Sequence, residues 1–122
     1  MRELVINLDA IAANLATMRG HAPGAKVCGV VKANAYGHGM VPVALRLQAE
    51  GIDYLGVADL TEALELRAAG ITIPILAWLH DFNEDFVAGV AADIQIGVST
   101  IAQLDLVAKA ARATGKIAQV HL

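Results

Sequence analysis

A lysine that ends an apolar run has the clearest capacity for chemistry in this sequence. Lys32 directly follows the valine-rich run Lys26–Val31, and Tyr36 and the string Gly37–Gly39 come shortly after it. At the rim of an apolar sheet an amine is partly desolvated, which favours its neutral, nucleophilic form. Such an amine can condense with carbonyl compounds, pyridoxal phosphate among them. The alternative is a solvated charge at a strand end, and spacing alone leaves both readings open.

The other groups with potential chemistry have simpler explanations. Three acids, at positions 81, 84 and 85, fit the charged start of a helix better than an acid–base pair or a metal site. The four histidines, at positions 21, 38, 80 and 121, show no metal-ligand spacing, so we expect no metal. His38 is expected to serve the turn after Tyr36. Cys28 lies inside an apolar run and is expected to be a small buried hydrophobe.

Composition excludes several classes of protein. The 122 residues hold 9 basic and 12 acidic side chains, a net charge of −3, so no basic patch for nucleic acid is expected. Hydrophobic residues make up 57%, enough to bury a core and to exclude disorder. No run approaches the roughly 18 apolar residues of a membrane span, and the start lacks the apolar core of a signal peptide. One cysteine allows no internal disulfide, and we expect a cytoplasmic protein.

Short runs rich in Ile and Val recur at intervals of about 20 residues, which is typical of strands buried on both faces. We expect strands within 26–31, 51–57, 70–77, 92–98 and 115–120. Helical patterns lie between them, one over Val41–Glu50 and one over Ile101–Ala113. A further segment, Glu3–Leu8, precedes a helix that starts at Asp9. It lies outside the rhythm and is a candidate for an extra strand packed elsewhere.

Capping residues mark where the helices begin and end. Asp59 with Glu62 has the spacing of an N-cap and its capping-box partner. Asp81 with Glu84 repeats this spacing ahead of the next helical pattern. Ser99 or Thr100 is expected to cap the last helix, and Gly115 to end it. These signals predict helices that begin within a few residues of each strand end.

Strands alternating with helices predict βαβ units around a parallel sheet, either doubly wound or closed into a (β/α)8 barrel. A barrel takes roughly 250 residues, about twice the length available here. We therefore expect an α/β fold in which residues 1–122 form the N-terminal part of a (β/α)8 TIM-type barrel. The last predicted strand runs up to Leu122, so we expect the sequence to belong to a longer barrel domain.

Nine consecutive residues, Val31–Gly39, resemble the pyridoxal-phosphate signature of the alanine racemase family. Segments near Ile6–Ile11, Gly56–Ala63 and Pro74–Leu76 are similar to the family too, so the resemblance covers essentially the whole chain. The family combines an N-terminal eight-stranded barrel with a C-terminal β domain and acts as a homodimer. It is a group of isomerases that interconvert L- and D-alanine and supply D-alanine for peptidoglycan.

The resemblance implies roles for three residues. Lys32 would hold the cofactor, pyridoxal 5′-phosphate, and act as the base on one face of the substrate Cα. Tyr36 would contact the cofactor phosphate, and Trp78 matches an apolar position beside the cofactor, although ordinary strand-end packing explains Trp78 equally well. The family's second base is a tyrosine of the partner subunit's C-terminal domain, outside these residues. We therefore expect this polypeptide alone to lack useful racemase activity.

Other functions remain open at this stage. The first alternative is a non-catalytic barrel protein that binds pyridoxal phosphate. Related racemases or decarboxylases on the same fold, and a fragment without a stable fold, are the others. Substrate choice among related enzymes depends on residues outside this sequence.

Overall fold

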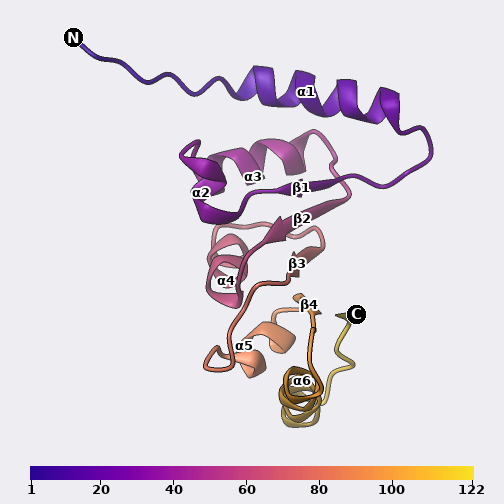
Figure 1. The fold of residues 1–122 in the computed structure, drawn as a ribbon. Helices are drawn as coiled ribbons and strands as arrows, with labels where there is room; N and C mark the ends of the chain where they lie inside the picture. The colour runs from indigo at the N-terminus through magenta and orange to yellow at the C-terminus, as the bar shows by residue number, and fades with distance from the viewer.

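The computed structural model describes residues 1–122 as parallel strands that alternate with helices (Figure 1). The strands are β1 (Cys28–Val30), β2 (Tyr54–Val57), β3 (Ile75–Ala77), β4 (Gln95–Gly97) and β5 (Val120–His121). The helices are α1 (Leu8–His21), α2 (Lys32–Tyr36), α3 (Met40–Ala49), α4 (Leu60–Ala68), α5 (Phe86–Ala91) and α6 (Ile101–Thr114). Each strand pairs with the next one along the chain, and all pairs are parallel. The predicted order of strands and helices is confirmed.

The two faces of the sheet differ in what covers them. Side chains alternate between faces along a strand, so Leu55 and Val57 of β2 point to one face and Tyr54 and Gly56 to the other. The first set belongs to the helix face, whose residues pack under the helices and include Leu55, Val57, Ile75, Ala77 and Ile96, all fully buried. The second set, the helix-free face, comprises Cys28, Val30, Tyr54, Gly56, Leu76, Gln95 and Gly97.

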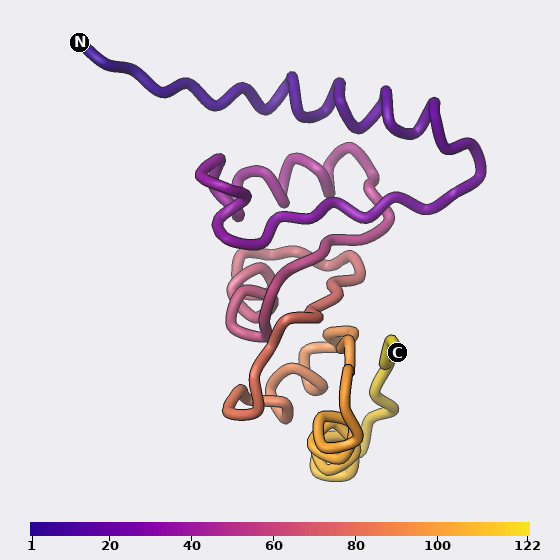
Figure 2. The backbone as a smooth tube through the Cα atoms, viewed as in Figure 1, coloured from indigo at the N-terminus to yellow at the C-terminus, as the bar shows by residue number.

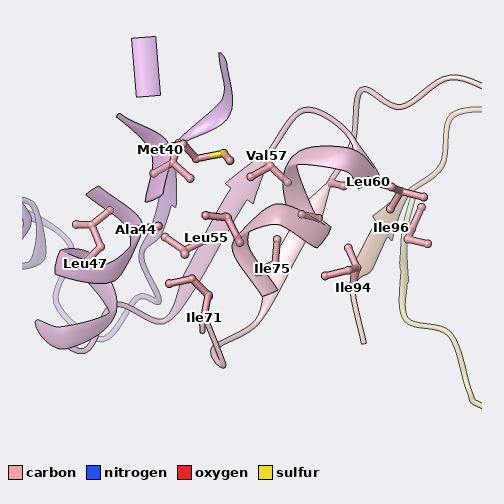
Figure 3. Packing of buried hydrophobic residues seen from close by; sticks show 14 of the residues in the cluster. Met40, Ala44, Leu47, Leu55, Val57, Leu60, Ile71, Ile75, Ile94 and Ile96 are labelled. Atoms are coloured by element: carbon pink, nitrogen blue, oxygen red, sulfur yellow. The ribbon is translucent and has the colours of Figure 1, made fainter. Parts of the chain in front are cut away.

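The hydrophobic core lies between the helix face and the helices (Figure 3). Ala44 and Leu47 of α3 and Leu60 of α4 point at the buried strand residues. Ala44 and Ala63 are fully buried, so small side chains let these helices approach the sheet closely. Burying each large side chain contributes about 1.5–3 kcal/mol, which makes this layer the main source of stability.

Three predicted helix boundaries are confirmed, two of them by hydrogen bonds and one by the backbone conformation. The Asp59 carboxylate accepts from the backbone N–H of Glu62 at the start of α4. The Thr100 hydroxyl accepts from Gln103 N–H at the start of α6, and Gly115 ends that helix in the left-handed conformation with φ 69°.

The prediction for the cap of α5 was wrong. Asp85, not Asp81, is the N-cap, and its carboxylate accepts from Ala88 N–H. Asp81 instead closes a small turn by accepting from Asn83 N–H. Of the predicted capping box, only the bond from Asp81 N–H to one Glu84 carboxylate oxygen is present, at 3.3 Å, and the other oxygen accepts from Leu60 N–H at the start of α4. Asp85 is the cap because it directly precedes the first turn of α5, so its side chain can reach the free N–H groups there.

The expected extra strand at Glu3–Leu8 is absent. Residues 1–7 contain no strand and run away from the rest of the chain (Figure 2), and the outer edge of β1 stays unpaired. Helix α1 begins at Leu8, one residue earlier than predicted, since the Asn7 side chain accepts from Ala10 N–H. The helix then lies beside α3. None of the helices has the length and apolar character needed to cross a membrane.

Candidate functional site

Lys32, Tyr36 and Trp78 all lie at the carboxyl edge of the sheet, where α/β proteins place ligand sites. The hydrogen-bond ladder extends one residue past β1, because Val31 N–H donates to Gly56 C=O at 2.8 Å. Lys32 follows directly and is half-buried, while Tyr36 is 71% exposed. The Lys32 Nζ lies 5.1 Å from the centre of the Tyr36 ring. The structure therefore brings these two predicted site residues together, in a cation–π contact.

The segment that joins Lys32 to Tyr36 is a left-handed helical turn. Four consecutive non-glycine residues have positive φ: Ala33 52°, Asn34 55°, Ala35 51° and Tyr36 50°. For residues with a Cβ this conformation costs roughly 1–2 kcal/mol each. The four residues together therefore make this turn unfavourable by several kcal/mol in isolation. Gly37 and Gly39 continue the positive φ, at 87° and 90°, and allow the tight turn predicted there. Strain of this kind persists only where surrounding contacts hold it.

Contacts within the turn provide part of that support. The C=O of Asn34 accepts from Gly37 N–H at 3.1 Å and from Gly39 N–H at 3.0 Å. The Asn34 side-chain oxygen also accepts from Met40 N–H, at 2.8 Å, where α3 begins. His38 Nδ1 lies 2.8 Å from Ala35 C=O. This contact confirms that His38 serves the turn.

Glu62 ties this turn to the sheet. One of its carboxylate oxygens accepts from Ala33 N–H at 2.8 Å, and the other accepts from Ala58 N–H at 2.7 Å. Glu62 was predicted to be the capping-box partner of Asp59, which would require a bond to the N–H of Asp59 itself. The structure corrects this prediction, since the side chain reaches past Asp59 to Ala58 and to Ala33 on the neighbouring strand end.

Trp78 follows β3 and lies across the helix-free face. A Cβ added at Gly97 of β4 would stand 2.8 Å from the Trp78 Cβ, and one added at Gly56 of β2 would stand 2.5 Å from Cζ3 of its ring. The side chain therefore starts against β4 and crosses β3 toward β2 and β1. Two glycines make room for it, and its ring forms a flat wall on the face that also carries Val30.

His80 fixes the loop after β3. Its side chain is buried, and its Nε2 lies 2.6 Å from Gly97 C=O, so Nε2 carries the donated hydrogen. The ring meets Phe86 edge-on, with ring centres 5.2 Å apart. Its Nδ1 is buried and has no hydrogen-bond partner. No group of three His, Cys, Asp or Glu side chains lies close enough together to hold a metal ion.

The prediction that Cys28 is buried was wrong. Its side chain belongs to the helix-free face and is exposed, because no helix covers that face. The sulfur nevertheless packs beside β2, 3.2 Å from where a Cβ of Gly56 would stand. This partial desolvation raises the pKa of the Cys28 thiol above its ordinary value.

The sequence of this chain matches one protein family over almost its whole length. Residues 6–122 match the family described as alanine racemase, N-terminal domain. The alanine racemase of Mycobacterium ulcerans (strain Agy99) is 51% identical over 120 residues, which are 98% of this chain and 31% of that protein.

Solved structures agree. The crystal structure of alanine racemase from D-cycloserine-producing Streptomyces lavendulae superimposes with a TM-score of 0.93 at 45% identity, over 96% of this chain and 31% of that one. The Bacillus anthracis alanine racemase with bound L-Ala-P gives 0.81 at 34% identity, over 96% and 30%. The chain thus spans about a third of the length of these relatives. The predicted fold class, the N-terminal part of a TIM-type barrel, is confirmed.

Proposed function

The chain belongs to the alanine racemase family, and from this premise we propose that residues 1–122 are the N-terminal portion of its barrel domain and hold the cofactor on Lys32. The observation that carries the proposal is the strand-end amine of Lys32 beside the exposed phenol of Tyr36, joined by a strained left-handed turn. Such strain concentrates where a functional group must be held in one direction.

The residues present fit pyridoxal 5′-phosphate as the cofactor. Lys32 offers a primary amine for a covalent link, and the Tyr36 hydroxyl is accessible for a hydrogen bond to a phosphate. Trp78, seated on Gly56 and Gly97, offers a flat apolar wall to an aromatic ring. When bound, pyridoxal phosphate supplies an electron sink for the charge left at a substrate carbon that has lost its proton.

Lys32 would also move the proton. The proposed role of its Nζ is to remove the hydrogen at Cα of alanine, or return it, on the face that the amine occupies. The half-buried position of Lys32 limits access of water to the amine. Interconversion of the two enantiomers needs a second acid–base group on the opposite face, and for the whole protein we propose that a partner subunit supplies it.

The wider role proposed for the whole protein follows from the family. It would be an isomerase that acts as a homodimer on alanine in the cytoplasm and supplies D-alanine for peptidoglycan. Neither a membrane nor a nucleic acid takes part in this role.

Reductive trapping tests the proposal on the 122-residue chain. The chain is incubated with pyridoxal phosphate, reduced with borohydride, digested and analysed by mass spectrometry. We expect the label on Lys32, its loss in Lys32→Ala, and its retention in the control Lys109→Ala, a substitution of an exposed lysine on α6. Tyr36→Phe should weaken capture of pyridoxal phosphate but leave capture of phosphate-free pyridoxal unchanged. A label spread evenly over all lysines would refute the assignment.

Deuterium exchange separates the racemase from the alternative, a non-catalytic barrel protein that binds pyridoxal phosphate. The loaded chain is incubated with each enantiomer of alanine in D₂O. A base on one face alone should exchange the Cα hydrogen of one enantiomer without producing the other. Exchange of neither enantiomer would favour the non-catalytic binder, and rapid racemisation would overturn the proposed need for a second group.

A further inference from the structure

We propose that Glu62 is a positioning residue that holds Lys32 and Trp78 in one fixed arrangement at the carboxyl edge of the sheet. The proposal rests on the proposed function in one respect, since it treats Lys32 as the residue that holds the cofactor. Its structural content, the hydrogen bonds from the Glu62 carboxylate to two backbone N–H groups, is independent of any ligand.

The first step is the bond to Ala33. The atoms from Cα of Lys32 to Cα of Ala33 lie in one peptide plane, which includes the Ala33 N–H. The Glu62 carboxylate accepts from that N–H at 2.8 Å. It therefore fixes the plane from which the Lys32 side chain departs, at the point where the backbone enters the left-handed turn.

The second step leads to Trp78. The other Glu62 oxygen accepts from Ala58 N–H at 2.7 Å, directly after β2. The C=O of Ala58 in turn accepts from Leu79 N–H at 2.6 Å. That N–H lies in the peptide plane that begins at Cα of Trp78. One carboxylate thus connects the ends of β1, β2 and β3, which carry the amine and the aromatic wall.

The third step concerns the need for a carboxylate. An ionised carboxylate presents two acceptor oxygens and no donor, so it can serve both N–H groups at once. A glutamine at this position would accept from only one of them and would turn its NH₂ group toward the other. Glu62 itself is anchored, because its backbone N–H donates to Asp59 at 2.8 Å at the start of α4.

The test compares Glu62→Gln with Glu65→Gln, a control substitution of an exposed residue on the same helix. Amide hydrogen exchange is followed by NMR, and trapping of pyridoxal phosphate on Lys32 by borohydride reduction and mass spectrometry. We expect Glu62→Gln to exchange the Ala33 or Ala58 amide about tenfold faster and to trap the cofactor several-fold more slowly. Both variants are compared well below their thermal midpoints, so that slower trapping by Glu62→Gln cannot come from unfolding.

The fluorescence of Trp78, the only tryptophan of the chain, gives a readout that needs no cofactor. We expect Glu62→Gln to shift or quench its emission and Glu65→Gln to leave it unchanged. Unchanged emission, together with trapping as fast as in the control, would overturn the proposal.

Two further outcomes are separable. If the unsubstituted chain captures no pyridoxal phosphate on Lys32, the proposed function fails, while amide exchange and fluorescence still decide the role of Glu62. If Glu62→Gln does not fold, amide exchange in the unsubstituted chain tests whether the Glu62 hydrogen bonds exist. Its Ala33 and Ala58 amides must then be protected from exchange, and free exchange at Ala33 would refute the contact.

Discussion

The two faces of the sheet are built in different ways. On the helix face, residues such as Leu55, Ile75 and Ile96 are fully buried and close-packed against α3 to α5. On the helix-free face, Val30 is 50% exposed and Trp78 is seated on glycines instead of side chains. The helix face thus stabilises the fold, and the helix-free face leaves room for the side chains of the candidate site and for a ligand. The difference teaches that stability and the candidate site depend on opposite sides of the same strands.

Replacing one leucine on each face of the sheet would test this division most strongly. Leu55→Ala removes a fully buried side chain from the helix face and should lower the free energy of unfolding by about 3–4 kcal/mol. Leu76→Ala acts on the partly exposed helix-free face and should cost about 1 kcal/mol. Denaturation by urea measures both values. Equal losses would show that the two faces contribute alike and would break the comparison.

A methyl group at Gly56 would sharpen the comparison on the helix-free face. In Gly56→Ala the new Cβ would stand 2.5 Å from the Trp78 ring, so the ring or β2 must move, at a cost of about 1–3 kcal/mol. We expect a change in tryptophan emission and slower capture of pyridoxal phosphate. Gly20→Ala, with open space around the site in α1, is the control and should be neutral or slightly stabilising. Emission identical to that of the control would argue against a ring seated on Gly56.

The smallest effect concerns the reactivity of Cys28. Its raised pKa means that less thiolate is present near neutral pH, and only the thiolate reacts with iodoacetamide. We expect the folded chain to be alkylated several-fold more slowly than the urea-unfolded chain at pH 8, with the difference shrinking as the pH rises through the raised pKa. The single cysteine makes the assay unambiguous. Equal rates at pH 8 would show that the sulfur is fully solvated.

Much of the architecture could be predicted from local signals. Runs rich in Ile and Val place four of the five strands, because these residues favour the extended backbone, and the fifth, predicted at 115–120, meets β5 only at Val120. Asp59, Thr100 and Gly115 mark helix ends through chemistry that acts within one turn. The strand-end position of Lys32 also follows from the sequence, since the apolar run ends directly before it.

The errors have physical causes of a different kind. Acids at 81, 84 and 85 are equally able to cap a helix, and only the path of the chain selects Asp85. The exposure of Cys28 depends on which face the helices cover, which no local pattern states. The left-handed turn contradicts the propensities of Ala33 and Ala35, so a search for favoured conformations misses it. The contact of Glu62 with Ala33 was missed because the spacing of Glu62 from Asp59 already suggested a role in capping its own helix.

The neighbour-to-neighbour pairing of the strands has a kinetic consequence. Cys28 pairs with Tyr54 and Ile96 with Val120, so each pairing closes a loop that contains a single strand-to-strand connection. The sheet therefore has low contact order for a parallel sheet, and the entropy lost on closing each loop is modest. We infer that folding can proceed by stepwise addition, each helix and strand docking on the unit before it without waiting for distant segments to meet.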